Sequence, residues 1–347
     1  MSRLRLNSLT IVAYLAFAAM SLLQARADDA LATEQFLASV SAAVNEANYR
    51  GTLIRTANGR MDAMQILHSN EDGFVREKLV AMDGEGREII RNGNELICLL
   101  PNRQIKIVDA NSVASNAFAR LQSASRTLGN FYSLVPRGTD RVTGRKALRY
   151  DLNPIDGYRY GHRFWIDAAT SLPLRMQLVS RNLVIEEIRF VEVEIGVTFA
   201  ADDFNSDIDS RGFTVMQGAM TAGADDVQSE TTIRPVGALA DIEESLGFQL
   251  NDDAIKIVEI NGRRSKRMVF SDGLAAVSVF VEQRPGNDNV RSAQLASMGA
   301  AHTYQHRVGG LTVTVVGDVP AETVKYLAEK AGEEWQTGFG GGETTNQ

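Results

Sequence analysis

Short runs of alternating residues, separated by turn dipeptides, fill the chain from Tyr49 to Val193 and constrain its fold more than any other feature. Tyr49–Thr56 and Met61–His68 flank Asn58-Gly59, which favours a two-residue hairpin because both turn residues tolerate a positive φ. Short strands at regular spacing, with turns between them, predict one large and strongly curved antiparallel sheet.

The same pattern predicts the other elements of this first domain. A helix is expected over Leu31–Ala47, where apolar residues fall on one stripe and Thr33 is placed to act as N-cap. A second helix is expected around Phe118 and Leu121. The further strands predicted are Phe74–Met82, Arg87–Arg91, Glu95–Leu100, Gln104–Val108, Ala147–Leu152, Tyr158–Ile166, Leu174–Val179 and Leu183–Val193.

A second, smaller unit is expected to start near Thr231, after a polar, Gly- and Asp-rich stretch from Ser206 to Ser229 that we interpret as a linker or a loosely held strand. Gly309-Gly310 joins two of its strands, and Pro320 opens a helix that is expected to end near Lys330, with Gly332 as the stop. The strands predicted here are Ile255–Ile260, Lys266–Phe270, Ala275–Glu282, Tyr304–Val308 and Leu311–Val316. The predicted fold class is α+β: an N-terminal curved open antiparallel sheet, a half-barrel packed with helices, then a smaller C-terminal α+β domain.

The start of the chain has the pattern of a cleavable signal peptide. Arg3 and Arg5 precede an apolar run from Leu9 to Leu23, which is shorter than the roughly 18–20 residues that span a bilayer. Ala25-Arg26-Ala27 is a small-x-small site, so cleavage is predicted after Ala27. The predicted segments are a signal peptide (1–27), a β-rich N-terminal domain (28–204), a linker (205–230), a C-terminal α+β domain (231–333) and a disordered tail (334–347).

Charge and cysteine content exclude some classes of protein. The formal net charge is −7, which argues against sequence-independent nucleic-acid binding, because that binding needs many cations facing phosphates. Cys98 is the only cysteine, so the chain forms no internal disulfide. It lies in an apolar run, and we expect a small buried hydrophobe rather than a reactive thiol.

No constellation of residues predicts catalysis or metal binding. His302 and His306 are four residues apart, but on a strand they would be about 13 Å apart, too far to hold one ion. Glu186 and Glu187 are adjacent on a predicted strand and therefore point to opposite faces. The sequence has no G-x-S-x-G, P-loop or H-E-x-x-H motif. We therefore predict a protein that is not an enzyme, with no catalytic residue, cofactor or metal.

Two groups of residues are candidates for binding. Apolar side chains of the first domain could line the concave face of the curved sheet, either as an acyl-chain pocket or as a filled core, and the sequence leaves both open. They are Leu53, Met64, Ile66, Leu79, Phe164 and Ile166. Arg263, Arg264, Lys266 and Arg267 could bind an anionic ligand or partner, although cations also protect edge strands from aggregation, which is the interpretation we favour.

Several stretches together resemble the RseB/MucB family of periplasmic regulators of the envelope-stress sigma factor. The resemblance runs in order from Phe36 to Lys330 and covers both domains. It is carried by "YRGTLIR", "REIIRNGNELICLLP", "FWIDAATSLPLRMQLV", "SDGLAAVSVFVE" and "MGAAHTYQHRVGGLTVTVVGDVP".

The resemblance implies a lipoprotein-carrier-like first domain and a small partner-binding second domain. It implies a periplasmic negative regulator that binds the periplasmic part of a single-pass transmembrane anti-sigma factor and shields it from regulated proteolysis. Mislocalised lipid or lipopolysaccharide would release the partner, and a homo-oligomer is left open. The alternatives are a periplasmic lipid or lipoprotein carrier that uses the curved sheet as an acyl-chain pocket, and an exported hydrolase of unrecognised type.

Overall fold

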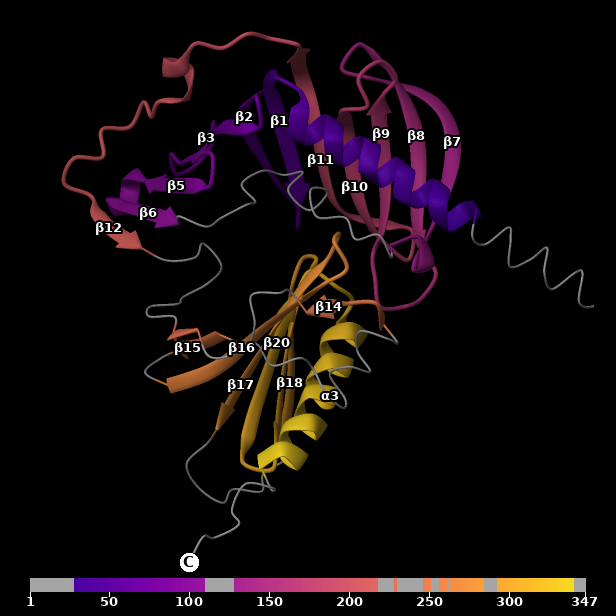
Figure 1. Cartoon of the computed structure of the whole chain (residues 1–347), viewed down its shortest axis with the longest axis vertical. Coiled ribbons are helices and arrows are strands. Elements are labelled where there is room, and N and C mark those ends of the chain that lie inside the picture. The colour runs from indigo at the N-terminus through magenta and orange to yellow at the C-terminus, as the bar shows by residue number, and fades with distance from the viewer. Residues whose placement is uncertain are drawn as a thin grey trace, which may run out of the picture.

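The computed structural model describes residues 28–109, 128–217, 228–229, 246–250, 256–260, 263–283 and 292–339, which form two β-sheets with helices against them (Figure 1). The predicted signal peptide and the predicted helix around Phe118 and Leu121 lie outside these residues. Within the described part of the chain, no helix has both the length and the apolar character needed to cross a bilayer.

The first sheet is open and curved, and its strand order is β12-β6-β5-β4-β3-β2-β1-β11-β10-β9-β8-β7 (Figure 1). Every neighbouring pair is antiparallel except β12 and β6, which are parallel. Its strands are β1 (Tyr49–Ala57), β2 (Arg60–Glu71), β3 (Phe74–Ala81), β4 (Glu88–Asn92), β5 (Glu95–Leu100), β6 (Ile105–Asp109), β7 (Tyr132–Val142), β8 (Arg145–Pro154), β9 (Gly161–Asp167), β10 (Pro173–Ser180), β11 (Leu183–Ile195) and β12 (Thr214–Gln217). Short 3-10 helices are η1 (Pro101–Arg103), η3 (Leu128–Asn130) and η4 (Ala201–Phe204).

One long helix, over residues 28–46, crosses the concave side of this sheet (Figure 1). Its Leu37, Val40 and Val44 are buried in one cluster with strand residues such as Leu53 and Phe164. Burial of each such side chain contributes about 1.5–3 kcal/mol. The predicted helix is confirmed, but Thr33 is not its N-cap: Thr33 lies inside the helix, where its hydroxyl donates to the Asp29 carbonyl at 2.9 Å.

The chain leaves β11 along the convex side of the sheet and returns to the sheet at its far edge. Lys78, almost fully buried, donates to the Asn205 carbonyl at 2.6 Å and to Asp207 at 2.7 Å. Ser206 donates to Glu88 at 2.5 Å. β12 then pairs with β6, so part of the predicted linker is a strand of the first sheet.

The second sheet has the strand order β13-β15-β16-β17-β20-β19-β18, with β14 pairing beside β16. Helix α3 (Ala321–Phe339) covers one face, and Val324, Leu327 and Ala328 share a core with strand valines such as Val279 and Val313. The strands are β13 (Gln228–Ser229), β14 (Gln249–Leu250), β15 (Lys256–Ile260), β16 (Arg263–Ser271), β17 (Ala276–Gln283), β18 (Ser292–Met298), β19 (Ala301–Val308) and β20 (Leu311–Gly317). The predicted α+β class, with a curved open sheet and a smaller second domain, is confirmed.

Three local predictions differ from the structure. Gly332 does not end the last helix, because α3 continues to Phe339; a Cβ at Gly332 would lie 3.0 Å from the Val308 side chain, so this glycine allows close helix–sheet packing. The strands β7 and β18 were not predicted, because neither has a run of alternating apolar residues. Tyr158 and Arg159 precede β9 and are not part of it.

Candidate functional site

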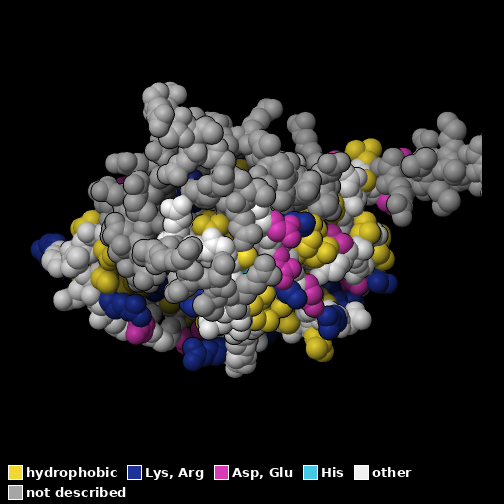
Figure 2. All heavy atoms as spheres, turned by 90° about the horizontal axis from the view of Figure 1, so that it is seen from below, with side chains coloured by type: hydrophobic (Ala, Val, Ile, Leu, Met, Phe, Trp, Pro, Cys, Tyr) yellow, Lys and Arg dark blue, Asp and Glu magenta, His cyan; other side chains and the backbone are white. Residues whose placement is uncertain are grey.

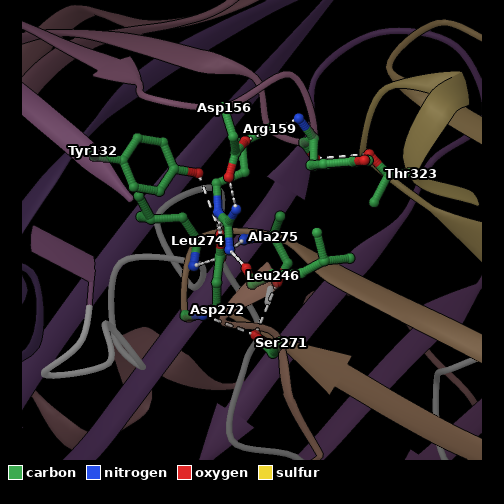
Figure 3. Close-up of polar contacts among 11 residues, drawn as sticks. Tyr132, Asp156, Arg159, Leu246, Ser271, Asp272, Leu274, Ala275 and Thr323 are labelled. Atoms are coloured by element: carbon green, nitrogen blue, oxygen red, sulfur yellow. Dashed lines mark hydrogen bonds and ion pairs between the residues drawn. The ribbon is translucent and has the colours of Figure 1, made fainter. Parts of the chain in front are cut away.

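A buried ion pair joins the two domains (Figure 3). Arg159 lies in the loop between β8 and β9, and Asp272 follows β16 in the second domain. The Arg159 Nε donates to Asp272 Oδ2 at 2.7 Å, and both side chains are almost completely buried, with 0% and 1% exposed. A buried pair of this kind costs desolvation energy, so it forms only where the geometry satisfies both charges.

The junction satisfies every polar group of Arg159 that it buries. Besides Asp272, the guanidinium donates to Asp156 and to the Leu246 carbonyl. The Arg159 Cζ lies over two aromatic rings, 4.4 Å from the centroid of Phe131 and 4.6 Å from that of Phe248. Phe131 belongs to the first domain and Phe248 to the second, so one guanidinium contacts an aromatic ring from each domain.

Asp272 is equally well coordinated. Its Oδ1 accepts from the backbone N–H groups of Leu274, at 2.9 Å, and Ala275, at 2.8 Å. Its Oδ2 also accepts from the Tyr132 hydroxyl at 3.3 Å, as Figure 3 shows. Burial, reinforced by the Asp272 charge, raises the pKa of Tyr132 well above its usual value, so the hydroxyl keeps its proton and remains a donor. Each carboxylate oxygen of Asp272 therefore accepts two hydrogen bonds.

Further contacts surround this ion pair. Thr323, in the first turn of α3, donates to the Tyr158 carbonyl at 2.7 Å. The Tyr160 hydroxyl donates to the Ala300 carbonyl at 3.2 Å, and burial raises the pKa of Tyr160 to about 12. Gly247 has φ +65°, and a Cβ there would lie 2.0 Å from the Phe131 ring, so only glycine fits. We call these residues the domain junction; through them the two domains contact each other.

A second polar cluster lies on the concave side of the first sheet. His68, Glu77 and Arg91 occupy one row across β2, β3 and β4, and all three are buried. The ring of Tyr49 stacks on His68 with a centroid distance of 4.8 Å, and His68 Nδ1 is 2.8 Å from the Ala47 carbonyl. Burial lowers the pKa of His68 to about 4, so the imidazole is neutral at neutral pH.

The predicted apolar residues of the first domain do lie together. Leu53, Ile66, Leu79, Phe164 and Ile166 are buried in one cluster with the first helix, and Met64 packs against it. They therefore share the concave side, as expected. Whether this cluster can open to admit an acyl chain stays a prediction.

The predicted cationic patch is divided by the strand that carries it. Lys266 and Arg267 are consecutive in β16, so their side chains project to opposite faces of the second sheet. The register places Lys266 beside Val281 of the core face and Arg267 beside Phe280 of the other face. Arg263 and Arg264 belong to β16, but their side chains lie outside the described residues. A patch built from all four on one face would require a different strand geometry. The favoured interpretation, that these cations protect an edge strand, is wrong, because β16 pairs with β15 on one side and with β17 on the other.

The remaining candidate residues from the sequence make contacts that stabilise the fold. Glu186 pairs with Arg55 at 2.9 Å, and Glu187 with Arg175 at 2.6 Å, from opposite faces of the sheet. Cys98 is buried, and burial raises the pKa of its thiol. His302 Nδ1 is 2.8 Å from the Val319 carbonyl. Over the residues that the structure describes, no group of three or more His, Cys, Asp or Glu could hold a metal ion.

The sequence did not identify the domain junction. Arg159 stands between two tyrosines, and Asp272 precedes a glycine after a strand, which is the pattern of an Asx turn. Either pattern is common in proteins, and only the fold brings the two together.

On the lower face of the molecule, Figure 2 shows charged side chains of both signs mixed with hydrophobic ones, with no large area of one sign in the part that is not grey.

Comparison with known proteins identifies the family. The MucB/RseB N-terminal domain matches residues 32–208, and the MucB/RseB C-terminal domain matches residues 244–331. The Pseudomonas aeruginosa protein named "Sigma factor AlgU regulatory protein MucB" is 27% identical over 312 residues, covering 89% of this chain and 93% of that protein. The Haemophilus influenzae "Sigma-E factor regulatory protein RseB" is 26% identical over 301 residues, covering 86% and 91%.

Solved structures give the same result for the fold. The complex of Pseudomonas aeruginosa MucA and MucB has a TM-score of 0.63 at 24% identity, covering 85% of this chain and 96% of the other. MucB in complex with MucA(peri) has a TM-score of 0.61 at 25% identity, with the same coverage. Both domains are thus matched in sequence and in fold, and the chain belongs to the MucB/RseB family.

Proposed function

We propose that this chain is a periplasmic negative regulator that binds the periplasmic segment of a single-pass transmembrane anti-sigma factor. The observation that carries the proposal is the match of both domains to a family whose relatives are named sigma-factor regulatory proteins. A relative that covers most of this chain was solved in complex with MucA(peri). Export with cleavage after Ala27 is part of the proposal.

The site chemistry supports a binding role. The buried charges at the domain junction are saturated by hydrogen bonds and ion pairs, so they hold the domains together and leave no reactive group. We infer that the two domains present one combined surface, and that covering a cleavage-prone segment of the partner reduces its access to a protease. This activity requires no bond to be made or broken.

The test is to titrate the mature chain with the periplasmic segment of the anti-sigma factor from the same cell and measure association. We expect binding, and we expect it to be lost or greatly weakened when the residues after Ser229 are deleted. A lipid or lipoprotein carrier would keep its activity in that deletion, because its curved sheet would be intact. No association at tens of micromolar would refute the proposal.

We also propose that a lipid or lipopolysaccharide acyl chain enters the concave side of the first sheet and releases the partner. The candidate residues there are apolar and clustered, and the first helix covers them, so entry requires this helix to move. Such a ligand can release the partner only if it binds the free chain more tightly than the complex. Native mass spectrometry of the purified chain should show a bound acyl ligand, and its addition should lower partner affinity.

A further inference from the structure

The C-terminal end of the first helix is held by side chains of β2. His68 Nδ1 is 2.8 Å from the carbonyl oxygen of Ala47, the residue that follows the helix. The Asn70 side chain donates to the Asn45 carbonyl at 2.8 Å, and the Asn70 backbone N–H donates to Asn48 Oδ1 at 2.9 Å. The last carbonyls of a helix have no partner within the helix, so these contacts hold its last turn against the sheet.

The contact with Ala47 determines where the His68 ring carries its proton. A carbonyl oxygen only accepts hydrogen bonds, so the neutral ring has its N–H at Nδ1 and its lone pair at Nε2. Nε2 is buried, and among the residues that the structure describes it has no hydrogen-bond partner. Protonation at Nε2 would place a positive charge and an N–H donor without an acceptor inside the domain. A buried donor without a partner is costly, so the closed helix end requires the neutral ring.

Three strands place ionisable groups around this ring. Tyr49 of β1 stacks on it, and burial raises the pKa of Tyr49 well above its usual value, so the phenol stays neutral. Glu77 of β3 and Arg91 of β4 follow His68 in the same row of the sheet and carry opposite charges. Burial lowers the pKa of His68 to about 4; the contact with Ala47 opposes this shift, and the Arg91 charge adds to it.

The middle of the helix is held by different contacts from its end. Leu37 and Val40 are fully buried in the core cluster of the first domain. In the last turn, Val44 belongs to the same cluster, and Ala47 packs against it with part of its surface exposed. The last turn can therefore open while the middle of the helix stays packed. Opening exposes His68 to water, where its pKa returns to about 6.5.

We propose that the contact between His68 and Ala47 is a pH switch: the last turn of the first helix packs against β2 while the ring is neutral, and protonation of the ring opens that turn. Ile66 lies two residues before His68 on the same face of β2 and belongs to the apolar cluster under the helix. Opening would therefore uncover this end of the cluster in acid. The inference goes beyond the proposed function, because it concerns the chain without partner or ligand.

The test measures amide hydrogen exchange of the mature chain at about pH 7.5 and about pH 5. With a pKa of His68 of about 4 in the closed state and about 6.5 in the open state, acidification should raise the open population about 30-fold. The protection factors of amides 44–47, corrected for the intrinsic effect of pH on exchange, should fall by that factor. At both pH values they should be lower than those of amides in β1 and β2, because the turn opens without unfolding of the sheet.

Two variants separate His68 from other titrating groups. His68→Gln keeps an N–H that can donate to the Ala47 carbonyl and is not protonated in this pH range, so its protection factors in the last turn should not change with pH. His302→Gln is the matched control, since His302 Nδ1 is also 2.8 Å from a backbone carbonyl, that of Val319 in the second domain. This variant should respond to pH like the wild type.

Two results would overturn the inference. One is a fall in protection that His68→Gln shares. The other is a last turn that is protected as strongly as β1 and β2 at both pH values, because the proton would then act only through unfolding of the whole domain. If His68→Gln does not fold, NMR titration of the His68 ring in the wild type decides: we expect a pKa below about 5, and a pKa of about 6 or higher would overturn the inference.

Discussion

Replacing Asp272 by asparagine tests the domain junction, because it removes one buried negative charge and preserves the shape of the side chain. The amide oxygen can still accept from the Leu274 and Ala275 N–H groups, so the local turn is retained. Arg159 loses its most buried partner. Breaking a buried ion pair by removing one partner costs about 3–5 kcal/mol. Arg159 keeps Asp156 and the Leu246 carbonyl, so we expect a loss near 3 kcal/mol.

The loss should appear mainly in the coupling between the domains, because the ion pair joins them. The chain has two tryptophans, Trp165 in the first domain and Trp335 in the sequence of α3. Single Trp→Phe variants of each therefore give a fluorescence probe for each domain during urea unfolding. The wild type should show one common transition with both probes. Asp272→Asn should show separate midpoints.

Two controls make the result interpretable. Arg181→Ala removes an exposed contact with Glu322 between the same domains and should cost less than about 1 kcal/mol. The double replacement Arg159→Met with Asp272→Asn removes both charges and keeps an oxygen that accepts from the Leu274 and Ala275 N–H groups, so it should cost less than Asp272→Asn alone, which leaves the Arg159 charge without its buried partner. If Asp272→Asn unfolds within about 0.5 kcal/mol of the wild type and both probes still coincide, the junction does not couple the domains.

Other substitutions follow from single contacts. His68 has a pKa of about 4 in the folded chain, against about 6.5 in the unfolded chain. The free energy of unfolding should therefore fall as the pH drops from about 6.5 to 4, by roughly 3 kcal/mol in total. The variant His68→Gln should flatten this dependence in urea titrations at several pH values. Gly247→Ala should lower the unfolding free energy by more than about 1 kcal/mol, measured the same way, because the Cβ would overlap the Phe131 ring. Lys78→Met should speed amide exchange in residues 214–217, because the segment that leads to β12 loses its anchor.

Local patterns were sufficient for much of the fold. The Asn58-Gly59 turn and the alternation around it located β1 and β2 closely, since hairpin geometry depends on neighbouring residues. β7 and β18 could not be found in this way. β7 is an edge strand whose proline and charges weaken the strand signal, and β18 has small polar residues on both faces. Their pairing depends on the strands beside them.

The candidate sites depended still more on long-range contacts. The apolar residues of the concave face were predictable because each lies in a recognisable strand. Arg159 and Asp272 are 113 residues apart in the sequence, and no local rule connects them. Lys266 and Arg267 illustrate the reverse: they are adjacent in sequence, yet the strand separates their side chains onto opposite faces.

The cleavage rate of the anti-sigma factor segment tests the account most directly. The segment should be incubated with the protease that starts its degradation, with and without saturating amounts of the mature chain. We predict that the chain slows cleavage at least tenfold, and that Asp272→Asn, which loosens the domains, protects less well. An unchanged cleavage rate under conditions where binding is complete would contradict the account.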